Sequence, residues 1–351
     1  LSVIYSMMGG VKAVIWTDAV QFVLFLAGGL FTVCYIPSVL PDGWSGAFKA
    51  AADGGKLHWF NSAFSLSAPI NIWMGILGGT VITLSSHGAE QLIVQRVLAC
   101  RTVRDGRRAL ILSAVLILPL FLIFLMVGAL LWVYYQQTAM AIEIPEVGGG
   151  MKANDFVFPI FMLTEVPHIL RGFLIVAILS AAMSSVSSAL TSLASVSTMD
   201  FFKPLLRGRG EDFYLRFSKV STLGWGLLLV GVAYLSREVV FVFNAAFSLR
   251  GLTSGALLGG VLMAIWMRRG RSHPVVVGMM AALGCMTLIQ LAPMWEVTNA
   301  WLKEWLGGPI FWPWYTLIGL LVAVGTTLLV RHTTDAGPAE SRDSSRIQGG
   351  T

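Results

Sequence analysis

The chain has 351 residues, of which 56% are hydrophobic and only 12% are charged, and its mean hydropathy is +0.76. This composition excludes a water-soluble globular domain and a disordered chain, and it is typical of a protein that crosses a membrane several times. The net charge of +6 gives no reason to expect a nucleic-acid partner, because the basic residues gather in short loops between apolar segments.

Eight apolar segments are long enough to cross a bilayer as helices, which takes about 20 residues each. They are too long for the strands of a membrane barrel, and helices and closed barrels are the only structures that satisfy the backbone in hydrocarbon. The sequence therefore predicts an all-α polytopic membrane protein with about eight transmembrane helices. In chain order the segments lie at 12–36, 68–98, 107–135, 168–199, 214–235, 239–267, 274–294 and 311–331, with a further helix end at 1–8.

Alternate loops between these segments are basic, and the others carry mainly acidic residues. Because short cytoplasmic loops are rich in Lys and Arg, we expect the basic loops and the C-terminal tail to face the cytoplasm. A bacterial inner membrane is the favoured location, with an organelle or a eukaryotic plasma membrane as alternatives. The basic loop residues are Lys12, Arg101, Arg104, Arg107, Arg108, Lys203, Arg207, Arg209, Arg216, Lys219, Arg268, Arg269, Arg271 and Arg331.

The first segment carries an acid, Asp18, in the stretch WTDAVQ near its cytoplasmic end. Acids inside membrane segments are rare and face protein or a water-filled cavity. We therefore expect Asp18 to point away from lipid. Its structural alternative is a partner for Lys12 or an interfacial helix cap.

The second segment contains GILGGTVITLSSHGAEQLIVQR. Each glycine inside a helix costs about 1 kcal/mol relative to alanine, so this helix is easily broken. His87 and Glu90 are three residues apart and are expected to share a helix face. No second His or Cys cluster accompanies them, so solute contact or internal hydrogen bonding is favoured over a metal.

The fourth segment, ILSAAMSSVSSALTSLASVSTMD, is rich in serine. Small hydroxyl residues let helices pack closely, and they also offer oxygen ligands without a full charge. Packing is the general expectation for such a face, and cation binding is the alternative. The serines that recur at three- and four-residue steps, and so line one helix face, are Ser180, Ser184, Ser187, Ser188, Ser192 and Ser195.

The sixth segment places Arg250 midway between its flanking charges. A buried arginine needs a counter-ion or a wet cavity. Either Arg250 binds a substrate carboxylate through parallel hydrogen bonds, or it forms a structural pair with Asp18, Glu90 or an acid elsewhere. Just beyond it, three glycines at four-residue spacing predict a face for close helix packing. They are Gly251, Gly255 and Gly259.

Three blocks together resemble the sodium:solute symporter family, which includes sodium/glucose and sodium/proline cotransporters. They are GGVKAVIWTDAVQ at 9–21, EQLIVQRVLACRTVRDGRRA at 90–109 and AAMSSVSSALTSLASVSTMDFFKPL at 181–205. The resemblance covers residues 1 to about 270, and the last two segments match only in hydrophobicity. It implies part of a five-plus-five inverted-repeat transporter core, with sodium and solute held near the midplane.

By this resemblance, residues 1–270 are a partial transporter core that runs from the end of the fourth to the tenth core helix. Residues 271–332 are two peripheral transmembrane helices, and 333–351 are a polar cytoplasmic tail. The missing N-terminal helices of the same transporter are then expected to complete the site.

The resemblance also implies a set of site residues. Sodium ligands fall on the backbone carbonyl of Ala181 and the hydroxyls of Ser184 and Ser185, and Asp18 falls on the inner sodium path. Neutral oxygens suit a hard cation that must be released in every cycle. The candidates for the substrate pocket are Ser86, His87, Glu90, Arg250 and Ser188.

Ser86 matches the position of a gate residue in the family. Ser86 and His87 replace the Tyr-Trp pair of the sugar carriers, which puts specificity for sugar in doubt. Ser188 is either a packing residue or a solute-facing one.

The predicted function is sodium-coupled secondary active transport of a small organic solute by alternating access. The expected partners are sodium as the co-transported ion, the solute and the lipid bilayer. One alternative is a sodium-responsive membrane sensor built on a transporter-like core. Another is an integral-membrane hydrolase, but no nucleophile elbow, zinc-hydrolase pair, Walker loop or dinucleotide fingerprint is present, so an enzyme is not expected.

Overall fold

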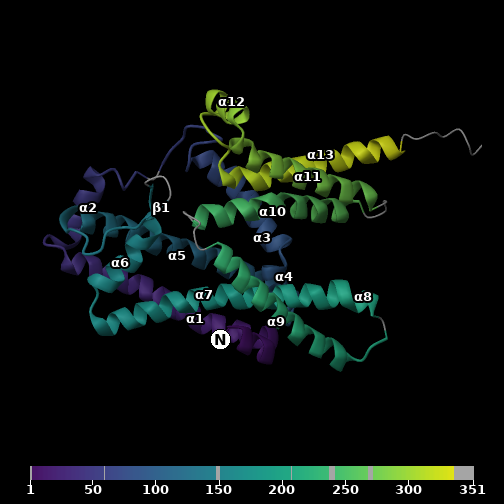
Figure 1. Ribbon diagram of the computed structural model, residues 1–351, viewed down its shortest axis with the longest axis horizontal. Coiled ribbons are helices and arrows are strands. Elements are labelled where there is room, and N and C mark those ends of the chain that lie inside the picture. Colours follow the sequence, from purple (N-terminus) through teal and green to yellow (C-terminus); the bar gives the residue numbers. More distant parts are fainter. Residues whose placement is uncertain are drawn as a thin grey trace, which may run out of the picture. The chain divides into compact units, whose positions relative to one another are not determined.

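The computed structural model describes residues 2–58, 60–147, 151–206, 208–236, 242–267 and 272–335. Within these ranges the chain is almost entirely helical (Figure 1). Two short strands, β1 (Glu146–Val147) and β2 (Met151–Lys152), pair in an antiparallel ladder. The predicted all-α class is confirmed.

The long helices are α1 (Ser2–Val39), α5 (Val103–Gln137), α7 (His168–Val196), α9 (Glu211–Leu235), α10 (Val242–Trp266), α11 (His273–Leu291) and α13 (Tyr315–Asp335). The short α-helices are α2 (Gly43–Asp53), α3 (Thr80–Gly88), α4 (Gln91–Leu98), α6 (Val157–Thr164), α8 (Lys203–Leu205) and α12 (Glu296–Leu306). Wider π-helical turns form η1 (Met74–Gly79) and η3 (Ser197–Phe202), and tighter 3₁₀ turns form η2 (Asn154–Phe156), η4 (Ala292–Met294) and η5 (Trp312–Trp314).

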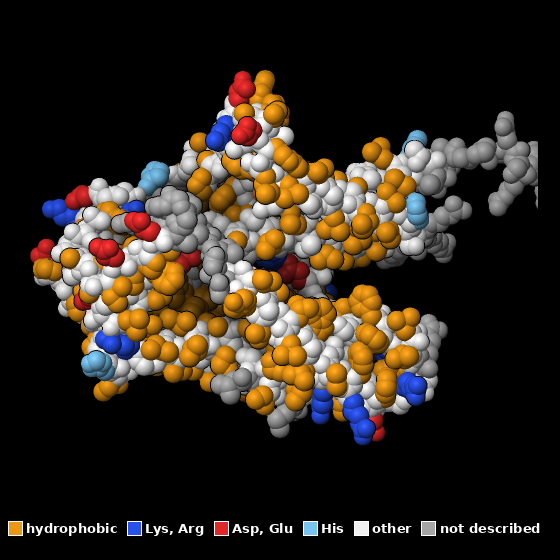
Figure 2. Space-filling model, in the orientation of Figure 1, with side chains coloured by type: hydrophobic (Ala, Val, Ile, Leu, Met, Phe, Trp, Pro, Cys, Tyr) orange, Lys and Arg blue, Asp and Glu red, His pale blue; other side chains and the backbone are white. Residues whose placement is uncertain are grey.

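Seven helices in the described part of the chain are long and apolar enough to cross a membrane. They correspond to seven of the eight predicted segments, so the chain is an integral membrane protein. Figure 2 shows hydrophobic side chains along the lengths of the helices, which is the surface that lipid contact requires. In α5, for example, only 6% of the most apolar 18-residue stretch is buried.

The helix ends differ from the predicted ones where local contacts extend them. Helix α1 is continuous from Ser2, so the predicted helix end at 1–8 belongs to the first span, with Leu1 outside the described residues. Helix α5 starts at Val103 because the Thr102 side chain accepts a hydrogen bond from the backbone N–H of Asp105, at 3.1 Å. Among the basic loop residues, Arg207, Arg268, Arg269 and Arg271 lie outside the described part.

The predicted segment 68–98 is not one helix but the succession η1, α3 and α4. The backbone N–H groups of Ala89 and Glu90 both donate to the carbonyl of Ser85, at 2.9 and 3.2 Å, and this ends α3. The prediction that His87 and Glu90 share a helix face is therefore wrong, because Glu90 lies in the break after the helix.

The chain divides into two compact units, each made of two stretches of sequence. Unit 1 comprises Leu1–Trp59 and Gln91–Val242, and unit 2 comprises Phe60–Glu90 and Phe243–Thr351. This grouping places η1 and α3 with α10, α11 and α13. These units are defined by packing, whereas the predicted division cuts the chain into consecutive segments at 270 and 332. The predicted division stays a prediction.

The core of unit 1 lies where α1, α5, α6 and α7 meet. Phe161 of α6 is fully buried, and the ring of Tyr134 of α5 packs edge-on against it at a centroid distance of 5.3 Å. The Tyr134 hydroxyl donates to the Glu165 carboxylate at 2.6 Å, and the Tyr35 hydroxyl of α1 donates to the Glu165 carbonyl at 2.9 Å. This core fixes one end of α1 against α7, and the two helices stay in contact along their lengths.

The core of unit 2 depends on close contact between α10 and α13. A Cβ atom added to Gly255 would lie 2.6 Å from the backbone N of Leu320 and 2.6 Å from the carbonyl O of Thr316. An added Cβ at Gly251 or Gly259 would also come within 3 Å of a side chain of α13. The predicted close-packing face is confirmed.

Candidate functional site

The serine-rich face of α7 is buried inside unit 1. Four of its six serines are less than one-tenth exposed, and α7 packs with α1 and α9. The small side chains therefore do serve packing, as the general expectation held. The buried serines are Ser180, Ser187, Ser188 and Ser192.

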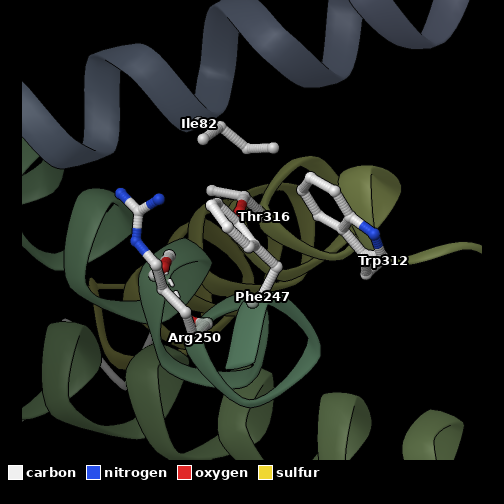
Figure 3. Close-up of a pocket in the computed structure, with 7 residues that line it drawn as sticks. Ile82, Phe247, Arg250, Trp312 and Thr316 are labelled. Carbon is white, nitrogen blue, oxygen red and sulfur yellow. Dashed lines mark hydrogen bonds between the residues drawn. The ribbon is translucent and has the colours of Figure 1, made fainter. Parts of the chain in front are cut away.

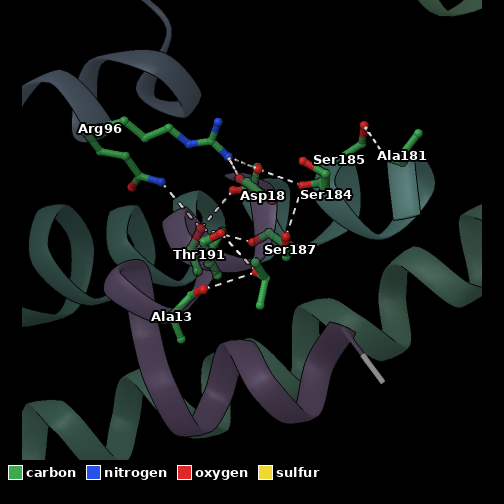
Figure 4. A network of polar contacts seen from close by, with 12 residues as sticks. Ala13, Asp18, Arg96, Ala181, Ser184, Ser185, Ser187 and Thr191 are labelled. Carbon is green, nitrogen blue, oxygen red and sulfur yellow. Dashed lines mark hydrogen bonds and ion pairs between the residues drawn. The ribbon is translucent and has the colours of Figure 1, made fainter. Parts of the chain in front are cut away.

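Hydroxyl and carbonyl oxygens are concentrated in one stretch of α7. The Ser187 and Ser188 hydroxyls both donate to the Ser184 carbonyl, at 3.0 and 2.7 Å. The Ser185 hydroxyl donates to the Ala181 carbonyl at 3.3 Å, which brings two of the predicted sodium ligands together (Figure 4). The third predicted ligand, Ser184, lies beside the carboxylate of Asp18.

Asp18 of α1 faces the interior of unit 1, as predicted, and its side chain is 13% exposed. Its Oδ2 accepts a hydrogen bond from Arg96 Nη2 at 2.5 Å, and the same nitrogen donates to the Ser188 hydroxyl. The other carboxylate oxygen, Oδ1, is buried and has no hydrogen-bond partner among the described residues. Arg96 is therefore the basic partner of Asp18, while the alternative partner, the Lys12 side chain, lies outside the described atoms.

Helix α4 bonds to α1 and α7 of the same unit through two consecutive residues. Next to Arg96, the Gln95 amide donates to the Thr191 hydroxyl of α7 at 3.4 Å (Figure 4). The sequence did not mark Gln95, Arg96 or Thr191 as site residues. The available signal was an arginine close to the break in an apolar segment, since such a residue needs a buried acid.

We expect Arg96→Gln to destabilise the protein by about 1 to 3 kcal/mol. Removing one partner of a buried pair costs about 3 to 5 kcal/mol, and the 36% exposure of the Arg96 side chain reduces that loss. The neutral double variant Asp18→Asn/Arg96→Gln should recover much of the stability, because no uncompensated charge remains. Thermal unfolding in detergent, followed by size-exclusion chromatography, measures both.

Lys203→Gln is the control for that experiment. It breaks the more exposed Lys203–Glu211 pair at 3.3 Å, whose loss should cost less than about 1 kcal/mol. A double variant at positions 18 and 96 no more stable than Arg96→Gln alone would show that the charges are not paired.

The other candidate residues lie in unit 2. Arg250 of α10 donates from Nε and Nη2 to Glu90 Oε1, at 3.0 and 2.7 Å. The Arg250 and Glu90 side chains are 31% and 17% exposed. Of the alternatives open for Arg250, the structure shows the pair with Glu90.

Ser86 and His87 of α3 are engaged in local hydrogen bonds. The buried Ser86 hydroxyl donates to the Thr83 carbonyl at 3.1 Å, and it lies 2.8 Å from His87 Nδ1. His87 Nδ1 is also 3.1 Å from the Thr83 carbonyl. These contacts agree with the internal hydrogen bonding expected of this stretch.

The cavity beside Arg250 is too small for a solute. Its volume is about 10 Å³, which is room for no more than one water molecule. Figure 3 shows Phe247 and Trp312 on one side of it and the Arg250 guanidinium on the other. The lining residues are Ile82, Phe247, Arg250, Gly251, Ser254, Trp312 and Thr316.

A second cavity in unit 2 is much larger, at about 540 Å³. That volume falls in the range of small-molecule sites. Phe247 and Trp312 also line this cavity, together with Phe243, Phe311 and the amide of Asn244. Ser86, His87 and Glu90 line neither cavity.

The predicted site residues thus fall into two groups, each inside one unit. Unit 1 holds Asp18 and the α7 residues, and Ser188 belongs there through its contact with Arg96. Unit 2 holds the pocket candidates Ser86, His87, Glu90 and Arg250.

Comparison with known proteins gives a consistent result. The rabbit (Oryctolagus cuniculus) sodium-dependent multivitamin transporter is 29% identical over 284 residues, which cover 80% of this chain and 43% of that protein. The sodium/sialic acid symporter of Proteus mirabilis (strain HI4320) is 27% identical over 290 residues, which cover 81% of this chain and 56% of that protein. The chain therefore spans about half the length of these relatives.

Solved structures agree with the sequences. A Na⁺-coupled sialic acid symporter, solved in a substrate-bound outward-open state with a novel Na⁺ site, superposes with a TM-score of 0.76 at 25% identity. The match covers 95% of this chain and 65% of that one. The family model of the sodium:solute symporter family matches residues 1–282. The chain accordingly belongs to the sodium:solute symporter family.

Proposed function

We propose that the protein carries out sodium-coupled transport of a small organic solute by alternating access. One observation carries this proposal: beside the hydroxyl-rich stretch of α7, the buried Asp18 carboxylate has one oxygen to which no group in the described part of the chain donates a hydrogen bond. A carboxylate oxygen can only accept, and leaving it unpaired in a protein interior is costly. A cation is the natural partner for such an atom.

The proposed sodium ligands are the Ala181 carbonyl and the hydroxyls of Ser184 and Ser185. In the structure the Ser185 hydroxyl donates to the Ala181 carbonyl. When a cation binds, that hydroxyl turns and both oxygens face the ion. Hydroxyl and carbonyl oxygens are hard ligands that carry no full charge, so they hold sodium and still release it.

Asp18 is proposed to lie on the inner path of the ion. Its negative charge attracts sodium, while Arg96 offsets part of that charge through its bond to Oδ2. This balance prevents a full carboxylate from trapping the ion, because an opposite charge nearby weakens its field. Ser188, which accepts from Arg96, is proposed to support this group.

The solute site is proposed to involve the unit 2 candidates, with Ser86 and His87 near the break in the helix. The relative from Proteus mirabilis is named for an acid, sialic acid, so organic acids are the first class to test. Binding of a solute carboxylate by Arg250 would require Glu90 to give up both of its hydrogen bonds. We therefore assign the Glu90–Arg250 pair a supporting role beside the solute.

We further propose that the basic loops and the C-terminal tail face the cytoplasm in a bacterial inner membrane. The start of α5 supports this orientation, because Arg101 just before the helix and Arg104, Arg107 and Arg108 in its first turns are all exposed.

The test is uptake into proteoliposomes by the protein produced from its complete coding sequence. Labelled carboxylates, amino acids and sugars are offered with an inward sodium gradient, and with potassium in its place. We expect one solute class to accumulate only with sodium. Empty vesicles and a collapsed gradient are the controls.

Two other results would change the assignment. Sodium-dependent structural change without uptake of any solute would favour the sensor. Hydrolysis of a lipid or peptide would indicate an enzyme, which we do not expect of a carrier.

A further inference from the structure

The residues just before the break between α3 and α4 form polar side-chain bonds to α10, and all of these bonds lie within unit 2. The buried Ser85 hydroxyl of α3 donates to the Ser254 carbonyl of α10 at 3.0 Å. Just after the end of α3, Glu90 accepts two hydrogen bonds from Arg250 of the same α10. The end of α3 is therefore tied to α10 at two points.

The second side of the break is fastened within unit 1. Arg96 of α4 bonds to Asp18, and Gln95 bonds to Thr191. One of the points where the chain passes from one unit to the other falls between Glu90 and Gln91. Polar side chains thus bond the residues before this boundary to unit 2 and the residues after it to unit 1.

The backbone at the break is irregular, and the space beside Gly88 is open. An added Cβ at Gly88 would meet no atom within 4 Å, so no close neighbour restricts it. Ala89 has already left the helical region, with φ −125° and ψ −23°. Few packed contacts and an irregular backbone are the usual features of a hinge.

We propose that Glu90 and Arg250 are positioning residues of the transport cycle, which hold α3 on α10 as one body while the chain bends at residues 88–91. This proposal rests on the proposed function, because alternating access is the motion that would bend the chain. It adds that α3 and α10 keep their contact through the cycle.

The chemistry of the pair suits a fastening. Both bonds are charge-assisted, and such bonds are about twice as strong as neutral ones. The guanidinium carbon also lies 5.9 Å from the centre of the Phe247 ring, within reach of a cation–π contact. Helix α10 in turn is held against α13 by the backbone contact at Gly255, so α3 is fastened to a firmly packed base.

The experiment measures distances between spin labels in proteoliposomes by pulsed EPR, with and without sodium. One pair, Leu84→Cys with Leu249→Cys, reports on α3 and α10. The other, Leu84→Cys with Leu98→Cys, spans the break. All three native side chains are exposed, at 49%, 64% and 76%. The native cysteines, Cys34, Cys100 and Cys285, are replaced by alanine.

We expect the α3–α10 distance to stay the same when sodium is added, and the distance across the break to change. In the Glu90→Gln/Arg250→Gln background the α3–α10 distribution should broaden. The charge-reversed variant Glu90→Arg/Arg250→Glu should narrow it again. Arg250→Lys keeps the charge without the planar fork and should give an intermediate width.

Three results would overturn the proposal: an α3–α10 distance that shifts with sodium, no sodium response across the break, or no broadening in the neutral variant. Sodium-dependent uptake is measured on the same preparations. Uptake that needs sodium together with a shifting α3–α10 distance rejects the fastening alone. Uptake that ignores sodium rejects the proposed function, and the neutral variant still decides whether the pair fastens α3.

Discussion

Replacing both predicted hydroxyl ligands, Ser184→Ala/Ser185→Ala, is expected to raise the sodium concentration for half-maximal uptake at least about tenfold. A tenfold change corresponds to about 1.4 kcal/mol, which is modest for two oxygen ligands, since a hydrogen bond to a charged group is worth about 1.5 to 3 kcal/mol. Uptake measured over a range of sodium concentrations, at saturating solute, reports this shift directly.

The matched control is Ser195→Ala on the same helix, outside the proposed ligand set and partly buried. It should leave the sodium dependence unchanged. Equal shifts in the control and the double variant would mean that the serines act only through packing. An unchanged sodium dependence in the double variant would remove these hydroxyls from the ion site.

Gly255→Ala is expected to destabilise unit 2 strongly for the addition of a single methyl group. The new Cβ would sit 2.6 to 2.7 Å from backbone atoms of Thr316, Gly319 and Leu320. Backbone cannot turn aside as a side chain can, so α10 and α13 must separate. Overpacking of this kind typically costs about 1 to 3 kcal/mol, and the midpoint of thermal unfolding in detergent should fall accordingly.

Gly260→Ala is a control on the same helix, where the three atoms nearest to the new Cβ all belong to the flexible side chain of Met279. It should cost less. Gly224→Ala on α9 meets no atom within 4 Å and should be neutral or stabilising by up to about 1 kcal/mol, because alanine favours the helix. Similar midpoints for Gly255→Ala and Gly224→Ala would contradict the contact between α10 and α13.

The membrane helices could be predicted because their signal is local. A run of apolar side chains long enough to cross the bilayer is read directly from the sequence, and α7, α9 and α13 begin within four residues of their expected starts. The glycine face of α10 was equally visible, since four-residue spacing alone places those residues together. The interior position of Asp18 could also be predicted, because an acid inside a membrane segment faces protein or water and not lipid.

The partners of the charged residues could not be predicted in this way. Asp18 and Arg96 are separated by 78 residues, and Glu90 and Arg250 by 160, so their pairing depends on how the helices pack. Arg250 had several acids to choose from, and only the placement of α3 beside α10 in unit 2 selects Glu90. The glycines of this segment indicated that its helix is easily broken, but they did not indicate that α3 ends at Gly88.

The discontinuous make-up of the two units bears on how the protein is synthesised. All residues of unit 1 exist once position 242 has been made, whereas residues 60–90 of unit 2 await the stretch from 243 onward. At about 5 to 20 residues per second, roughly ten to thirty seconds separate the synthesis of Glu90 from that of Arg250. During that interval the nascent chain carries a carboxylate whose guanidinium does not yet exist. Unit 1 can therefore assemble before unit 2 is complete, and α3 can pack against α10 only after α10 has left the ribosome.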